Sequence, residues 1–140
     1  MTITINICQL GRKRSTVTAV PFELPVRPAT VRELIIAVVQ ICVTAYNERV
    51  RKGETGIRPI TDEQLADMET VGKLAFGVNY GAKEADEAAA IANALQSFED
   101  GLYRIFLGER ELTSLEEALA LSENDELTFI RLTMLSGSVF

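Results

Sequence analysis

The spacing of hydrophobic residues changes twice along this chain, and that change limits the folds it can adopt. In residues 2–7 isoleucine alternates with polar residues, which is typical of a half-buried strand. Residues 31–52 place their apolar side chains at helical spacing, and the alternating pattern returns after Gly101. With 140 residues the chain is long enough for one domain with its own core. The pattern therefore predicts a single α+β domain over residues 1–140.

A β-hairpin is predicted at the N-terminus. Gly11 and the basic residues 12–14 follow the first strand as a charged turn, and residues 15–24 return as a second strand. Pro21 cannot donate a ladder hydrogen bond, so we expect this strand to lie at a sheet edge or to be bulged at that point. We interpret the three basic residues as a solvated hairpin tip rather than as a site for phosphate or an acidic partner.

Capping signals mark the predicted helices. Thr30 and Glu33 form a capping box that opens a helix running to about Lys52. A second capping box at residues 61–64 predicts a short helix, and the alanine-rich residues 83–98 predict another long one. The remaining predicted elements are a strand at residues 102–107, a turn at Gly108 and Glu109, a short strand or turn at Leu112, a brief helix at residues 114–119, a turn at residues 121–126 and a final strand at residues 127–132.

The side-chain inventory excludes most catalytic chemistry. The chain has no histidine, which removes Ser-His-Asp and Cys-His catalysis, histidine-ligated zinc and any histidine pH switch. Cys8 and Cys42 lie in different predicted elements, without metal-ligand spacing or an activating histidine, so we expect inert, reduced thiols. The acidic groups at residues 116–117 and 123–126 lack calcium-loop spacing and are interpreted as solvated surface. We therefore expect a protein that is not an enzyme and that binds no cofactor or metal.

Charge and hydropathy limit the partners that we expect. The formal net charge is -6, which divides into +5 over residues 1–60 and -11 over residues 61–140. An acidic total disfavours nucleic-acid binding, because phosphate contacts need basic surface. The N-terminus shows no signal-peptide pattern, and the longest apolar stretch, residues 34–43, is too short to cross a bilayer. We expect a cytoplasmic protein that binds neither nucleic acid nor membrane.

The order of the predicted elements and two C-terminal segments resemble the ubiquitin-like β-grasp superfamily. Residues 104–112 (Arg-Ile-Phe-Leu-Gly-Glu-Arg-Glu-Leu) are similar to ubiquitin's strand-turn segment, with one extra residue in the turn. Residues 121–129 are similar to the stretch before the last strand in ubiquitin and in the small subunit of molybdopterin synthase. The resemblance implies a mixed β-grasp sheet packed on one long helix, with residues 53–101 as a helical insertion before the third strand. That insertion either contacts a partner as a helix in a groove or, as we favour, packs against its own domain.

In this superfamily, which includes sulfur carriers and bacterial ubiquitin-like proteins, the chemistry lies in the C-terminal tail. Ubiquitin and the sulfur carriers end in two glycines, whereas residues 133–140 hold one glycine, Gly137, between Ser136 and Ser138. The resemblance implies a protein modifier or carrier: a processing peptidase cuts after Gly137, and a partner activating enzyme uses ATP to adenylate the exposed carboxylate. The alternative is a β-grasp interaction subunit that is never conjugated and that binds a protein partner through its sheet face and its insertion.

An apolar patch on the sheet is the other feature that the resemblance implies. The matching positions are Ile105 and Ile130, from the third and last strands, and Leu135 and Phe140 of the tail extend the candidate partner surface. A register that differs by one residue would turn either isoleucine inward, because successive side chains of a strand point to opposite faces. We favour a core position for Ile105 and leave Ile130 open between core and surface.

Overall fold

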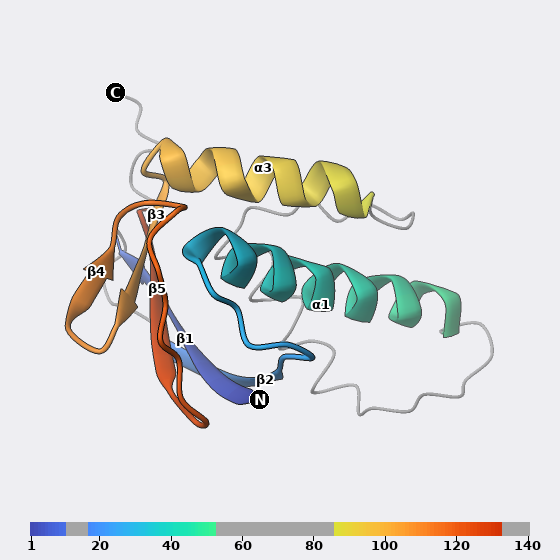
Figure 1. The fold of residues 1–140 in the computed structure, drawn as a ribbon. Coiled ribbons are helices and arrows are strands. Elements are labelled where there is room, and N and C mark those ends of the chain that lie inside the picture. Colours follow the sequence, from blue (N-terminus) through green and yellow to red (C-terminus); the bar gives the residue numbers. More distant parts are fainter. Residues whose placement is uncertain (11–16, 53–85, 133–140) are drawn as a thin grey trace.

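The computed structural model describes residues 1–10, 17–52 and 86–132 (Figure 1). These residues form an α+β structure with a five-stranded mixed sheet and two helices, so the predicted fold class is confirmed at this level. In chain order the elements are β1 (Thr2–Leu10), β2 (Val17–Glu23), α1 (Val31–Lys52), α3 (Glu87–Glu99), β3 (Tyr103–Leu107), β4 (Arg110–Leu112) and β5 (Glu126–Leu132). The predicted turn at residues 11–14, the predicted helix that begins at residues 61–64 and the tail lie outside the described residues.

The sheet has the strand order β2-β1-β5-β3-β4. β1 and β5 pair in parallel at its centre, while β1–β2, β3–β5 and β3–β4 pair antiparallel. β2 therefore lies at an edge, as Pro21 predicts, and Pro21 pairs opposite Thr4. A proline without a backbone N–H is tolerated there because an edge strand has a neighbour on only one side.

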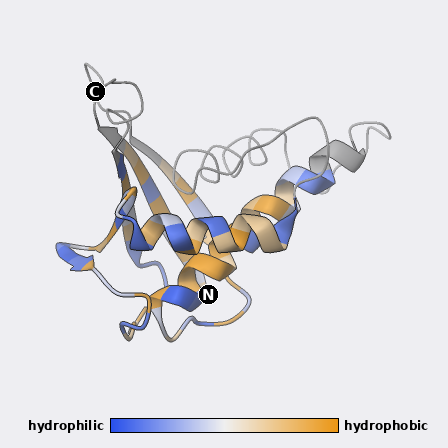
Figure 2. Ribbon diagram, turned by 90° about the horizontal axis from the view of Figure 1, so that it is seen from above, coloured by the Kyte–Doolittle hydropathy of each residue, from blue (hydrophilic) through white to orange (hydrophobic). Residues whose placement is uncertain are grey.

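The hydrophobic core lies between one face of the sheet and the two helices, which are both on that face (Figure 1). Hydrophobic and hydrophilic residues alternate along the strands (Figure 2), so each strand buries every second side chain. From the sheet the core contains Ile3, Ile5, Ile7, Val20, Phe22, Tyr103, Ile105, Leu112, Leu127 and Phe129, and α1 adds Val31, Leu34, Ile35, Val38, Val39, Cys42 and Val43.

The N-terminus of α1 is capped at the predicted residues, with one difference. The backbone N–H of Glu33 donates to the Thr30 hydroxyl oxygen at 3.3 Å, as a capping box requires. The Glu33 carboxylate, however, accepts from the N–H of Ala29 at 2.9 Å instead of from Thr30 itself. The helix nevertheless begins and ends where the sequence predicts.

The predicted brief helix at residues 114–119 is wrong. This segment is a turn followed by an isolated bridge between Thr30 and Ala118. Its carbonyl groups accept from the first turn of α1: the N–H of Val31 donates to Glu117 at 3.1 Å, and the N–H of Arg32 donates to Leu115 at 2.9 Å. Helix N-termini leave such N–H groups without intrahelical partners, and the segment satisfies them by crossing the end of α1.

Glycine closes the turns on either side of β3. Gly101 has φ +76° after the C-terminus of α3, where its N–H donates to Phe98 O at 3.1 Å and the next N–H, of Leu102, donates to Ser97 O at 3.0 Å. These two bonds form a Schellman motif, which needs the left-handed backbone that glycine adopts without strain. Gly108 has φ +63° at the first position of the two-residue β3–β4 loop, as a type II′ turn requires.

α3 begins later than predicted within the described residues and packs against its own domain. Asp86 is its N-cap, and the Asp86 carboxylate accepts from the N–H of Ala89 at 3.2 Å. Ala94 and Phe98 on the inner side of α3 belong to the core. The buried Tyr103 hydroxyl donates to Ala94 O at 2.7 Å and so ties α3 to β3. The described part of the segment 53–101, residues 86–101, therefore packs against α1 and β3 of its own domain. This is the alternative that we favour from the sequence.

Candidate functional site

The face of the sheet opposite the helices, here called the outer face, carries the side chains that alternate with the core. Ile130 of β5 pairs with Cys8 of β1 on one side and with Arg104 of β3 on the other. Two residues earlier in β5, on the same face, Thr128 pairs with Phe106 of β3. The half-buried residues Cys8, Phe106, Thr128 and Ile130 form the outer-face patch, which is the most apolar part of this face that the structure describes.

Ile105 does not belong to this patch. Its side chain is 0% exposed in the core, where it pairs with Phe129 and Leu112. The predicted place of Ile105 in an exposed apolar patch is therefore wrong, and the core position that we favour from the sequence is correct, because Ile105 shares the inner face with Tyr103. Phe106, which no sequence pattern singled out, is the β3 residue that lies beside the last strand on the outer face. The sequence feature that could have indicated it is its place directly after Ile105, because neighbouring residues of a strand point to opposite faces.

The predicted tail residues cannot be placed in this geometry. Leu135, Ser136, Gly137, Ser138 and Phe140 lie outside the described residues. The described chain reaches Leu132 at the end of β5. Of the predicted site residues, the structure thus describes Ile105 in the core and Ile130 on the outer face.

The acidic residues singled out in the sequence have structural partners. Glu116 accepts from Arg32 at 2.6 Å, and Glu117 pairs with Arg110. Glu123, Asp125 and Glu126 accept from Thr2 N, Ser122 N and Asn6 Nδ2, at 2.9, 2.8 and 3.1 Å. Among the described residues, no group of three or more His, Cys, Asp or Glu side chains is arranged to hold a metal ion.

Glu117 makes the stability of the turn after β4 depend on pH. The backbone N–H of Thr113, first, and the Arg110 guanidinium, second, donate to its carboxylate and hold the pKa of Glu117 below its ordinary value. A carboxyl group with a lowered folded-state pKa stabilises the fold above its unfolded pKa, and this contribution is lost as the pH falls through the folded pKa.

We therefore expect the wild type to lose more thermal stability than Glu117→Gln as the pH is lowered from about 6 to about 3. Thermal unfolding of both proteins across this range measures the difference. Glu23, whose pKa is lowered by the Thr2 hydroxyl and by the N-terminal amine, accounts for part of the loss that remains in the variant. Parallel curves of melting temperature against pH for the two proteins would show that Glu117 contributes no pH-dependent stabilisation.

Cys8, Cys42 and Tyr103 lie in the sheet or in the core. Both cysteines are free thiols, with Cys42 buried in the core and Cys8 half-buried on the outer face. Burial raises the pKa of the Tyr103 phenol, which stays neutral and donates to Ala94 O. Its ring stacks on Phe129 with centroids 6.1 Å apart. Tyr103 therefore acts as a packing residue between α3 and the sheet.

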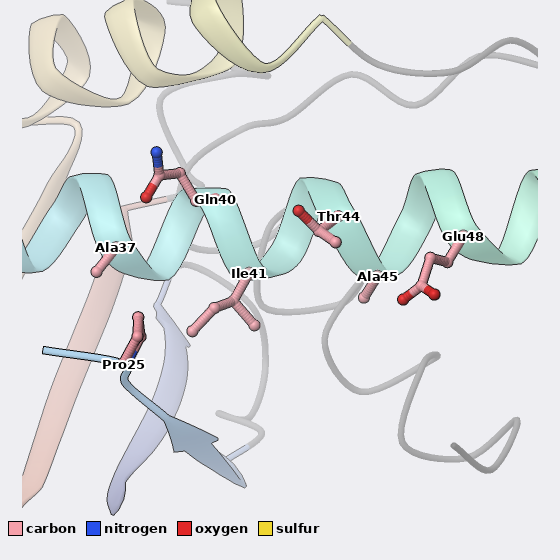
Figure 3. Close-up of a pocket in the computed structure, with 7 residues that line it drawn as sticks. All are labelled: Pro25, Ala37, Gln40, Ile41, Thr44, Ala45 and Glu48. Atoms are coloured by element: carbon pink, nitrogen blue, oxygen red, sulfur yellow. The ribbon is translucent and has the colours of Figure 1, made fainter. Parts of the chain in front are cut away.

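Two hollows open on the helical side of the molecule and at its end. The first, of about 300 Å³, lies along α1, where Ala37 and Ile41 point toward Pro25 (Figure 3). Its described lining is Pro25, Ala37, Gln40, Ile41, Thr44, Ala45 and Glu48, with a single titratable side chain. The second, of about 310 Å³, lies between α3, β3 and β4 and is lined by Phe98, Glu99, Gly101, Tyr103, Arg104, Glu111, Leu112 and Thr113.

No protein-family model, curated protein or solved structure matches the chain. None of the described helices has the length and apolar character needed to cross a membrane.

Proposed function

We propose that this chain is a ubiquitin-like β-grasp protein that works by binding a protein partner through the outer face of its sheet. The observation that carries the proposal is the outer-face patch: Phe106 and Ile130 are large apolar side chains on a face opposite both described helices. Both side chains are half-buried, so each keeps apolar area on this face that a partner can cover. A mixed sheet packed on one long helix supports the β-grasp assignment. The proposal assigns no catalytic step to the chain itself and no cofactor.

The test compares two charge substitutions of equal size on different surfaces. Ile130→Lys places a charge in the patch, whereas Thr44→Lys places it on the exposed side of α1. Both proteins are produced in the native cells and crosslinked, and recovery of each crosslinked partner is measured against the wild type. Thermal unfolding establishes that both variants are folded.

We expect a partner of the wild type to be recovered at least about tenfold less with Ile130→Lys and equally with Thr44→Lys, because a buried unpaired charge at an interface is costly. Phe106→Lys should reproduce the loss. Equal recovery with all of these proteins contradicts the proposal. Loss confined to Thr44→Lys moves the interface to α1.

A second proposal concerns the tail, as the resemblance to ubiquitin implies. β5 occupies the middle of the sheet, and Leu132 leads from it into residues 133–140. In this version a peptidase cuts after Gly137, and an activating enzyme forms an acyl adenylate on the new carboxylate with release of pyrophosphate from ATP. A thiol then displaces AMP and passes the protein to its target.

Intact mass of the protein from its native cells tests this version. We expect a form that ends at Gly137, or a covalent adduct through that residue, and we expect Gly137→Glu to abolish the adduct. A mass that ends at Phe140 in every fraction would exclude conjugation and leave the outer-face proposal standing.

A further inference from the structure

The cleft between α3, β3 and β4 adjoins the outer face. Arg104 and Glu111 line the cleft, and the strand register also places them beside the outer-face patch: Arg104 pairs with Ile130, and Glu111 pairs with Phe106. A partner that covers the patch would therefore extend over the mouth of the cleft. The lining of the cleft then determines which side chain of the partner can enter it.

The lining of the cleft is apolar at some positions and acidic at others. Phe98, Tyr103 and Leu112 contribute buried apolar side chains, with at most 8% of each exposed. Glu99 and Glu111 contribute two carboxylates and Arg104 one guanidinium. The C-terminus of α3 adds the partial negative charge of a helix end, so the cleft is negative overall.

Both carboxylates retain hydrogen-bonding capacity. The Glu111 Oε2 atom lies 3.8 Å from Arg104 Nε, which is an ion pair but too long for a hydrogen bond. Within the part of the chain that the structure describes, the carboxylate of Glu99 has no hydrogen bond or ion pair. Two neighbouring acidic residues already have partners, since Asp100 accepts from Gln96 Nε2 at 3.0 Å and Glu117 pairs with Arg110. Glu99 and Glu111 are thus the acceptors that a ligand would meet.

We propose that this cleft binds an arginine side chain of the protein partner that occupies the outer-face patch. An arginine has an aliphatic stem that suits the apolar lining and a planar guanidinium that carboxylates bind through paired hydrogen bonds. A volume of about 310 Å³ accommodates one such side chain. This inference rests on the proposed function, because the outer-face patch brings the partner to the mouth of the cleft.

The test uses N-acetyl-arginine methylamide as the probe and the full-length ¹⁵N-labelled protein at low ionic strength. We expect chemical-shift changes centred on the amides of Gly101, Arg104 and Thr113, with a dissociation constant of about 1–10 mM. The neutral isostere N-acetyl-citrulline methylamide should bind at least about fivefold more weakly, because it lacks the charge that the carboxylates attract.

Three variants locate the acceptors. Glu99→Gln and Glu111→Gln should each weaken binding of the arginine probe about threefold, and the double variant should weaken it further. Glu109→Gln is the matched control, since Glu109 is an exposed glutamate of the β3–β4 turn outside the cleft lining. Equal binding of the two probes, or unchanged binding to the double variant, would overturn the inference. Ile130→Gln, which makes the patch polar without adding a cation beside Arg104, should still bind the arginine probe, so failure of the cleft and failure of the outer-face interface give different results.

Discussion

Ile105→Ala is expected to lower the free energy of unfolding by about 2–5 kcal/mol, whereas Ile130→Ala is expected to lower it by about 1 kcal/mol. The two residues are chemically identical and lie on adjacent strands of the sheet. Ile105 is completely buried against Phe129 and Leu112, so its truncation removes apolar contacts and leaves a cavity. Ile130 is half-buried on the outer face, where truncation leaves no enclosed space.

Denaturant unfolding of the two variants and the wild type measures this difference directly. Comparable slopes of the transitions would show that the two substitutions act on the same cooperative unit. If Ile130→Ala costs as much as Ile105→Ala, then Ile130 is enclosed and the outer-face patch is not a surface that a partner can reach. The stability experiment therefore also constrains the proposed function.

The alternation of polar and apolar residues predicts where the strands lie, but it does not show which side chains of β3 point to the core. Along β1 every residue between the isoleucines is polar, so the inner face follows from the sequence alone. β3 reads Tyr-Arg-Ile-Phe-Leu, in which Arg104 is the only polar residue and both faces carry large apolar side chains. Only pairing with β5 settles that Ile105 points inward and Phe106 outward. That pairing joins residues separated by more than twenty positions in the chain, which local periodicity does not report.

The segment that crosses the start of α1 shows a second limit of local patterns. Leu115, Ala118 and Leu119 have helical spacing, which is why residues 114–119 predict a helix. Their backbone instead bonds to residues 29–32, more than eighty positions earlier. The N–H groups of the first turn of α1 need acceptors, and the carbonyl groups of Leu115 and Glu117 supply them. The ion pair of Arg32 with Glu116 follows from the same crossing.

The candidate site was predictable only in part for a related reason. Ile130 could be named from its match to the last strand of ubiquitin, and the structure places it on the outer face. The cleft, by contrast, combines Glu99 from α3, Arg104 from β3 and Glu111 from β4. These residues share no motif, and their proximity depends on how α3 packs on β3. No spacing rule connects them before the tertiary structure is known.

Removing residues 54–100 and joining the ends is expected to unfold the protein. The deletion removes the whole of α3 (Glu87–Glu99), and with it Ala94 and Phe98 of the core. Tyr103 would lose the acceptor of its hydroxyl and the Phe98 ring, whose centroid lies 5.8 Å from its own. Truncation of Phe98 alone should cost about 3–5 kcal/mol, which is a large part of the 5–15 kcal/mol typical of a domain.

Circular dichroism and denaturant unfolding of the deletion variant, of Phe98→Ala and of Ala92→Ser test this expectation. Ala92 is exposed on the same helix, so its substitution should change the free energy of unfolding by no more than about 0.5 kcal/mol. A deletion variant that unfolds cooperatively near the wild-type midpoint would show that residues 53–101 are a separable insertion. The expected collapse would instead mean that α3 is required for the core, and the insertion boundary would then have to end before Asp86. In that case the cleft at the end of α3 forms only in a chain that keeps this helix, which makes binding of the arginine probe an independent report of its position.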